Sequence, residues 1–140
     1  MIEGKIRIIT LGIVRNEQEE ILFDAMKDPN KNLDFLRPIG GGVEFSESCE
    51  NAIAREFEEE IGAEVTDTKL IKIFENIFQY NGKLGHEIVF FFEVVLAGNK
   101  FYELKEILVK EGSENRVARW YSKSDLEKTV ILPPQIVKYL

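Results

Sequence analysis

GGVEFSESCENAIAREFEEEIGA, residues 41–63, combines a glycine turn, a helical pattern and a crowd of glutamates. Apolar side chains recur at every fourth position of its second half: Cys49, Ile53, Phe57 and Ile61. This period predicts an amphipathic helix with one face turned to a core. Either Ser46 or Ser48 is a suitable N-cap, and Gly62 suits the left-handed residue that follows a helix.

The glutamates of this helix are crowded on one side. At the helical spacing of about 100° per residue, Glu56, Glu59 and Glu60 share an arc of ~100°, while Glu58 lies well around the helix from them. Like charges at this separation repel and raise one another's pKa unless a cation lies among them. Carboxylate oxygens are hard ligands suited to Mg²⁺ or Mn²⁺. The segment therefore predicts a divalent metal site.

The spacing of the charged and glycine residues resembles the Nudix box, the signature of the Nudix hydrolases. The matching positions are Gly41, Glu47, Arg55, Glu56, Glu59, Glu60 and Gly62. Two departures lie near its start, where Ser46 replaces a glycine and Pro38 is displaced by one residue. The resemblance implies an α/β fold, an α/β/α sandwich with a mixed β-sheet flanked by helices, and a single Nudix domain over residues 1–140.

The resemblance also implies a reaction, the hydrolysis of a nucleoside diphosphate linked to another moiety by attack of water at phosphorus. Glu56, Glu59 and Glu60 would bind the metal, and a carbonyl of the glycine turn at Gly40 could join them. The resemblance implies an ion pair between Glu47 and Arg55 that orients the motif. Helical spacing places Arg55 about a quarter-turn from the metal-binding carboxylates.

Two regions of the sequence could supply the general base. One of the box glutamates could take the proton from water, as could a glutamate of a later loop, as in several Nudix enzymes. Glu111 and Glu114 precede Trp120 in the part of the chain where such loops occur in the family. Each is equally readable as an exposed loop acid.

Substrate contacts are expected at Arg37, Gly41 and Tyr80. Arg37 precedes the glycine turn and could bind a phosphate or serve only the fold. Tyr80 lies seventeen residues beyond Ala63, near the position where relatives that cleave diadenosine polyphosphates carry a tyrosine. An aromatic residue entering a hairpin turn is also ordinary in a sheet. We expect nucleoside triphosphates or dinucleoside polyphosphates to be preferred to ADP-ribose.

The rest of the sequence reads as strands and short helices. Predicted strands are Ile6–Val14, Glu20–Met26, Lys69–Tyr80, His86–Leu96 and Val117–Tyr121; predicted helices are Ser124–Lys128 and Pro134–Tyr139. The first two strands suggest a hairpin, and the next two are joined through Asn81-Gly82, a dipeptide favoured in tight turns. Their apolar runs suggest central strands. Residues 98–116 show no clear pattern.

Composition limits the partners. The net charge of -7 argues against binding nucleic acid through phosphate neutralisation. A single cysteine, Cys49, and a start without a signal-peptide pattern indicate a cytoplasmic protein, and no apolar run is long enough to span a membrane. The expected partner is a small nucleotide substrate, and a homodimer is left open. The alternative function is a non-catalytic Nudix-like sensor that binds a nucleotide metabolite, although a sensor has no need of all three metal-binding glutamates.

Overall fold

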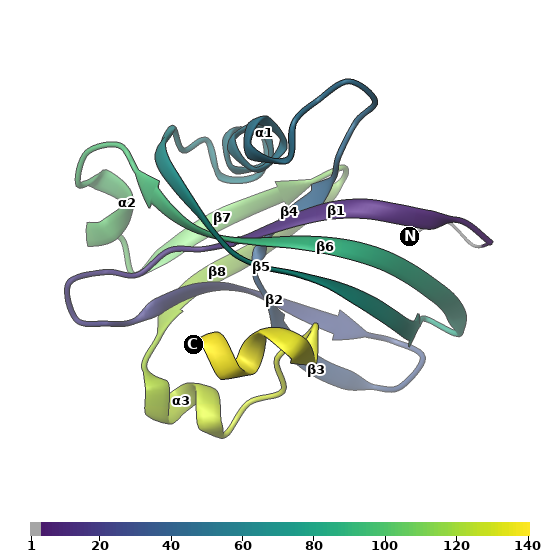
Figure 1. The fold of residues 1–140 in the computed structure, drawn as a ribbon. Helices are drawn as coiled ribbons and strands as arrows, with labels where there is room; N and C mark the ends of the chain where they lie inside the picture. Colours follow the sequence, from purple (N-terminus) through teal and green to yellow (C-terminus); the bar gives the residue numbers. More distant parts are fainter. Residues whose placement is uncertain (1–3) are drawn as a thin grey trace.

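A computed structural model describes residues 4–140 as two four-stranded sheets with helices on both sides (Figure 1). The first sheet has the strand order β4-β1-β6-β5 and the second β3-β2-β8-β7. The elements are β1 Ile6–Ile13, β2 Ile21–Asp28, β3 Leu33–Arg37, β4 Ile39–Gly42, α1 Cys49–Ile61, β5 Val65–Tyr80, β6 Lys83–Leu96, α2 Lys100–Glu103, β7 Glu106–Glu111, β8 Glu114–Tyr121, α3 Lys123–Glu127 and the 3₁₀ helix η1 Pro134–Tyr139.

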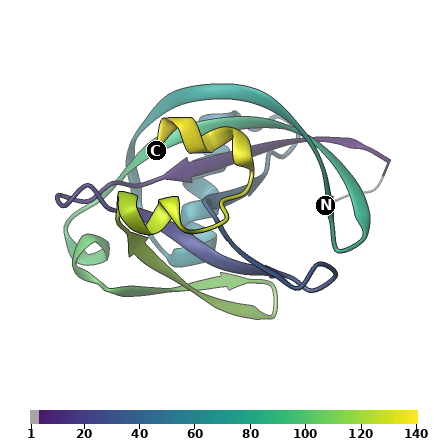
Figure 2. The same ribbon diagram turned by 90° about the horizontal axis from the view of Figure 1, so that it is seen from below.

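The first sheet is mixed and the second is antiparallel throughout. β1 runs parallel to β6 and antiparallel to β4, while β5 is antiparallel to β6. In the second sheet β2 pairs with β3 and β8, and β8 with β7, always antiparallel. α1 covers one side of the strands in Figure 1, and α3 and η1 lie on the opposite side in Figure 2. The expected α/β class, with a mixed sheet flanked by helices, is confirmed.

Two expectations about the strands were wrong. β1 and β2 do not form a hairpin, because they belong to different sheets and only Arg15 and Ile21, beside the turn, form a bridge. β5 is an edge strand and not a central one. Its apolar residues include Ile73 and Ile77, which are 45% and 61% exposed. Apolar content alone does not distinguish a buried strand from an edge with one open face.

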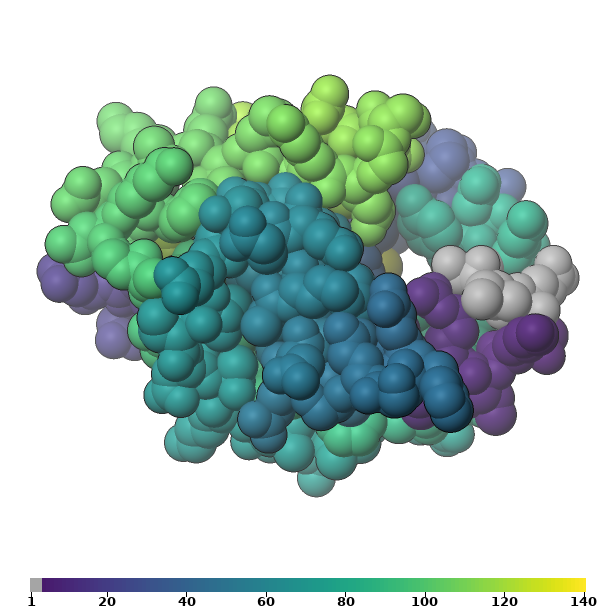
Figure 3. Space-filling model, turned by 90° about the horizontal axis from the view of Figure 1, so that it is seen from above, coloured from purple at the N-terminus to yellow at the C-terminus, as the bar shows by residue number. Residues whose placement is uncertain are grey.

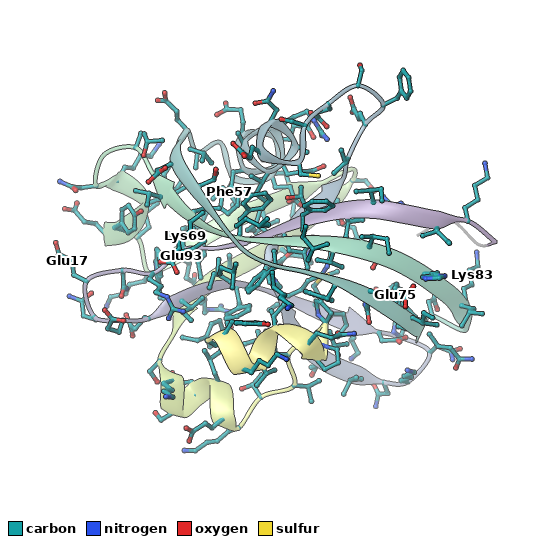
Figure 4. All side chains as sticks on the ribbon, in the orientation of Figure 1. Glu17, Phe57, Lys69, Glu75, Lys83 and Glu93 are labelled. Atoms are coloured by element: carbon teal, nitrogen blue, oxygen red, sulfur yellow. The ribbon has the colours of Figure 1, made fainter. Side chains whose placement is uncertain are left out.

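α1 forms as its sequence predicts. The Ser48 hydroxyl accepts a hydrogen bond from the Asn51 amide, and Gly62 ends the helix in the left-handed region with φ 72°. Phe57 is fully buried between the helix and the strands (Figure 4). The helix packs so close that a Cβ on Gly12 would lie 2.8 Å from the Phe57 ring. The glycine in β1 therefore sets how near the glutamate helix comes to the first sheet.

The segment without a sequence pattern, residues 98–116, contains α2, β7 and the beginning of β8. The turn between β5 and β6 has the predicted form, with positive φ at Asn81 (51°) and Gly82 (75°). The two short C-terminal helices lie within one residue of their predicted positions. Within residues 4–140, no helix is both long and apolar enough to cross a membrane.

Candidate active site

The glycine run lies where β3 of the second sheet passes into β4 of the first sheet. β4 lies beside β1, with Gly41 opposite Thr10 and Gly40 opposite Leu11. A Cβ on Gly40 would collide with the Thr10 carbonyl, and one on Gly41 would lie 2.5 Å from Glu56 Oε1. Side chains are therefore excluded where the box carboxylates meet the strand backbone, which leaves backbone groups open to a ligand.

Glu60 is the most enclosed glutamate of the box. It is 5% exposed, and its Oε2 accepts a hydrogen bond of 3.2 Å from the Gly40 amide. Burial first, and then the charges of Glu111 and Glu56, raise its pKa to about 8, while Arg37 acts in the opposite direction. A hydrogen bond with Glu111 also favours the protonated form. Enclosed carboxylates this close share a proton or need a cation.

Glu56 extends this acidic cluster towards the glycine turn. Its side chain is 12% exposed and lies against Gly41. Burial raises its pKa, an effect that Arg55 opposes through its charge and a 3.1 Å hydrogen bond, while Glu59 and Glu111 raise it further. Glu56, Glu60 and Glu111 thus form one acidic cluster in which each charge disfavours the others.

Arg55 contacts Glu47 as the family resemblance implies. Its Nε donates to Glu47 Oε2 at 2.7 Å and its Nη2 donates to Glu47 Oε1 at 3.0 Å. These bonds lower the pKa of Glu47 and raise that of Arg55. Nη2 also donates to the Gly42 carbonyl at 2.9 Å. This two-pronged contact ties the loop, the glycine turn and the helix together.

The predicted separation of Arg55 from the metal-binding carboxylates was wrong. Nη1 donates to Glu56 Oε1 at 3.1 Å and to Glu59 Oε2 at 3.2 Å. Angular spacing around a helix ignores the length of the arginine side chain, which bends back over the next turn. Glu59 differs from Glu56 and Glu60 because its side chain is 58% exposed and directed to Arg55.

The acidic cluster suits a divalent cation in its chemistry. Across residues 4–140, no three acidic, histidine or cysteine side chains already converge as a complete metal site. The donors that are present are carboxylates, backed by the carbonyls of the glycine turn, and these are the ligands of Mg²⁺ and Mn²⁺. Burial first, and then the neighbouring carboxylates, raise the pKa of Glu60 and of Glu56, so the cluster disfavours its own negative charge. These residues therefore suit a divalent metal ion, whose positive charge would neutralise the carboxylates.

The structure separates the two late-loop glutamates. Glu111, the last residue of β7, faces Glu60 and forms a 3.4 Å ion pair with Arg116. Glu114, the first residue of β8, has a side chain 69% exposed and bonded to Arg116 Nη1 at 2.6 Å. Only Glu111 joins the acidic cluster, and residue order in the sequence could not show this because both lie beside the same tight turn.

Tyr80 lies apart from the acidic cluster. Its hydroxyl donates to the Lys27 carbonyl at 3.2 Å and its ring meets Phe35 edge-on with 6.2 Å between centroids. Tyr80 and Glu114 line a cavity of about 550 Å³ whose lining includes none of the box glutamates. Tyr80 thereby links the β5–β6 turn to the β2–β3 hairpin.

Arg37 occupies a central position. It is the last residue of β3, is partly buried, and lowers the pKa of Glu60, Glu87 and Tyr80 through its charge. These three groups lie on α1, β5 and β6, so the charge of Arg37 acts on the acidic cluster and on both strands of the β5–β6 hairpin. A cation there can meet a phosphate attached to a nucleoside.

Comparisons with known proteins agree with this geometry. The sequence profile of the NUDIX domain matches residues 5–139. An 8-oxo-dGTP diphosphatase of Haemophilus influenzae is 34% identical over 93 residues, which are 66% of this chain and 65% of that protein, so the match spans less than two thirds of the relative.

Solved structures agree over nearly the whole chain. A structure from work on MutT of Aliivibrio salmonicida and Vibrio cholerae is 28% identical, with a TM-score of 0.64 and 96% of both chains covered. MutT NUDIX hydrolase of Burkholderia pseudomallei, at 22% identity and a TM-score of 0.66 over 96% of both chains, shares the fold.

Proposed function

Because the chain belongs to the Nudix family, we propose that it is a pyrophosphohydrolase that cleaves a nucleoside diphosphate linked to another moiety, with a divalent metal. The observation that carries the proposal is the acidic cluster around Glu60, a buried carboxylate whose neighbours are acidic and whose pKa is raised to about 8. A folded protein tolerates such a cluster at neutral pH when a cation binds there.

The proposed metal ligands are Glu56, Glu59 and Glu60, with the Gly40 carbonyl as a further oxygen donor. Glu56 and Glu60 already face the glycine turn, and Glu59 would leave Arg55 to join them. Mg²⁺ is the expected ion and Mn²⁺ a substitute, because both take carboxylate oxygens and retain sites for phosphate. When bound, the metal supplies charge neutralisation of the diphosphate and a more acidic water.

The chain's own residues orient the reactants and move the proton. Arg55, through Glu47 and the Gly42 carbonyl, holds the helix against the glycine turn. We assign Glu111 as the general base, since it faces Glu60 and is kept in place by Arg116. Glu114, exposed and bonded to Arg116, is the weaker candidate.

Nucleoside triphosphates are the proposed substrates, with dinucleoside polyphosphates next and ADP-ribose last. Arg37 would bind phosphate, Gly41 would allow the close approach of the diphosphate, and Tyr80 would contact the nucleoside side of the substrate. The name of the Haemophilus influenzae relative supports a triphosphate. A single domain over residues 1–140, a cytoplasmic location and a homodimer stay predictions.

Product analysis tests the proposal. With Mg²⁺ we expect the triphosphates dGTP and 8-oxo-dGTP to be cleaved with the highest kcat/KM, diadenosine tetraphosphate with a lower one and ADP-ribose with the lowest, and none to be cleaved in EDTA. Glu111→Gln should lower kcat by about a hundredfold with little change in KM, as for loss of a general base. Glu114→Gln is the matched control, since it bonds the same arginine, and should retain activity.

Four results would each contradict a part of the proposal. Binding of nucleotides without turnover would indicate the sensor function instead. Full activity in excess chelator would show that the reaction needs no divalent metal. A preference for ADP-ribose would contradict the assigned substrate class. A full loss in Glu114→Gln with normal Glu111→Gln would transfer the base to Glu114.

A further inference from the structure

A hollow opens between the two sheets beside the glutamate helix. Figure 3 shows it bordered by the blue residues around the box, the purple start of β1 and the teal residues near the β5–β6 turn. The Asn81 amide donates to Asp28 at 3.2 Å, and Tyr80 reaches the Lys27 carbonyl, so the tips of two hairpins meet at its far end. The hollow is therefore enclosed on the side away from the box.

Glu87 lies in the wall of the first sheet at this end. It is on the central strand β6, directly opposite Arg7 of β1 and Asn76 of β5. It shares a strand face with Val89 and Phe91, which pack in a core with residues of the second sheet such as Phe23. Its side chain consequently emerges on the face of the first sheet that turns towards the second.

Glu87 is a buried carboxylate whose oxygens are free to accept hydrogen bonds as far as residues 4–140 are concerned. It is 7% exposed, and within residues 4–140 it accepts no hydrogen bond and forms no ion pair. Burial raises its pKa, while the charges of Arg37 and Arg7 lower it. A buried carboxylate is costly unless it is paired, so a hydrogen-bond donor of a ligand would stabilise it.

The side-chain amide nitrogen of the neighbouring Asn76 is a hydrogen-bond donor that bonds no residue of 4–140. Gln135 Nε2 donates both to the Glu75 carbonyl at 3.1 Å and to Asn76 Oδ1 at 3.2 Å. Because the backbone carbonyl fixes the Gln135 nitrogen as a donor, Asn76 must present its oxygen there and turn Nδ2 elsewhere. Gln135 is thus a positioning residue for that amide.

Both residues keep a small exposed fraction, 7% for Glu87 and 8% for Asn76. In the described part of the chain, the fully enclosed side-chain polar atoms without a partner are Thr10 Oγ1 and Gln135 Oε1. The Asn76 amide nitrogen and the Glu87 carboxylate are not among them, although no residue of 4–140 pairs with either. A charged acceptor and a neutral donor therefore lie side by side on adjacent strands, accessible to a ligand.

We propose that Glu87 and Asn76 read the base of the substrate and select guanine, an inference that rests on the proposed nucleotide hydrolysis for its biological meaning. Guanine presents N1–H and N2–H₂ as adjacent donors with the O6 acceptor beside them. The two donors match the two oxygens of Glu87, and O6 matches the Asn76 Nδ2 donor. Adenine presents one donor group and no carbonyl, so it makes fewer of these contacts.

Arg37 would fix the orientation in which the substrate binds. Its charge acts on both Glu87 and Glu60, so the guanidinium lies within electrostatic range of the base-reading pair and of the acidic cluster. A phosphate bound near Arg37 thus leaves the base on the Glu87 side and the reacting diphosphate on the Glu60 side. Binding the base at one end and a phosphate at Arg37 would hold the substrate in one orientation, with its phosphorus in place for attack by water.

Binding of nucleoside monophosphates without metal tests the base site separately from catalysis. Titration calorimetry in EDTA should show dGMP binding about tenfold more tightly than dIMP, which lacks the N2 amino group, and more tightly again than dAMP. Glu87→Gln should weaken dGMP about tenfold and bring its affinity to that of dIMP. Asn76→Asp should weaken dGMP and narrow its advantage over dAMP, because a donor becomes an acceptor.

Glu93→Gln is the matched control. Glu93 lies on the same strand and face as Glu87 but at the far end of β6 from Lys83 (Figure 4), where it pairs with Arg15 at 3.4 Å. It should keep the dGMP preference. Unchanged base preference in Glu87→Gln and Asn76→Asp, both folded by circular dichroism, overturns the inference, as does equal or undetectable binding of the three monophosphates by the wild type.

The two proposals fail separately. Selective dGMP binding that depends on Glu87, without Mg²⁺-dependent turnover of any triphosphate, supports the base site and removes the hydrolase. Turnover of dGTP and dITP at equal kcat/KM, unaffected by Glu87→Gln, supports the hydrolase and removes the base site.

Discussion

Asp24 and Glu60 are buried to nearly the same extent, at 3% and 5% exposure, yet their surroundings are opposite. Asp24, on β2, accepts three hydrogen bonds of 2.8 to 3.1 Å from the Arg116 guanidinium. Burial raises its pKa and Arg116 lowers it. Glu60 has one amide hydrogen bond, from Gly40, and its close neighbours Glu111 and Glu56 are acidic.

The difference separates a carboxylate that the fold neutralises from one that it does not. A buried ion pair holds the second sheet at Asp24, where β2 meets β8. No guanidinium bonds Glu60 within the described range, and Arg37 acts on it only through its charge. An unpaired buried charge lowers the stability of the fold, so a residue with no role beyond the fold would be paired or apolar there. The unpaired charge of Glu60 at the glycine turn therefore indicates a ligand-binding group.

Replacing the uncompensated carboxylate should give the largest effect. Glu60→Gln should lower kcat by about a hundredfold to a thousandfold, because it removes a charge that would hold the metal, while the protein stays folded. Glu58→Gln, on the exposed side of the same helix, should leave kcat unchanged. The measurement is steady-state hydrolysis of dGTP at saturating Mg²⁺. Full activity in Glu60→Gln would remove Glu60 from the site and end the contrast with Asp24.

Replacing the neutralised carboxylate should act on stability instead. Asp24→Asn leaves Arg116 buried with a weaker partner, so the free energy of unfolding should fall by about 3 kcal/mol. We expect kcat to change less than tenfold. Urea denaturation measures the loss, and Glu106→Gln, which breaks an exposed pair with Arg119, is the control and should unfold at the same urea concentration as wild type. An Asp24→Asn protein as stable as the control would show that the buried pair is not structural.

Sequence reasoning located the helix, its caps and the box because these depend on local rules. Ser48, Gly62 and the fourfold apolar spacing act within a few residues of one another. The Arg55–Glu47 pair was predicted for the same reason, through the family spacing. The pairing of β1 with β6 and of β2 with β8 joins residues about 80 to 100 positions apart, which no local pattern encodes.

The contacts that the sequence could not decide, such as the choice between Glu111 and Glu114, depend on those long-range pairings. Glu111 reaches Glu60 because β7 lies against α1, and Asp24 meets Arg116 because β2 lies beside β8. A weak signal was present, since Asp24 interrupts an otherwise apolar stretch of β2 and Glu87 directly precedes the apolar run of β6. A polar residue at a buried strand position marks a pair or a site, but its partner is known only from the fold.

The pH dependence of stability should show the smallest and most specific difference between the two carboxylates. The pKa of Glu60 is about 8 in the folded protein against 4.5 ordinarily, so between these values the folded state binds more protons than the unfolded state. Metal-free wild type should therefore be most stable below pH 4.5 as far as this group is concerned, and lose that stability as pH rises through 8. The burial-raised pKa of Glu56 adds in the same direction.

Glu60→Gln isolates this effect, because glutamine does not titrate and the remaining groups, Asp24 included, stay in place. In EDTA, the fall in unfolding free energy between pH 5.5 and pH 8.5 should be smaller in the variant than in wild type by at least about 1.4 kcal/mol, the equivalent of one pKa unit. Glu58→Gln should keep the wild-type slope. Saturating Mg²⁺ should flatten the wild-type curve, since an ion that binds the ionised cluster stabilises the folded state. Parallel pH curves for wild type and Glu60→Gln would mean that the carboxylate is already neutralised within the fold, as Asp24 is, and that the acidic cluster needs no cation.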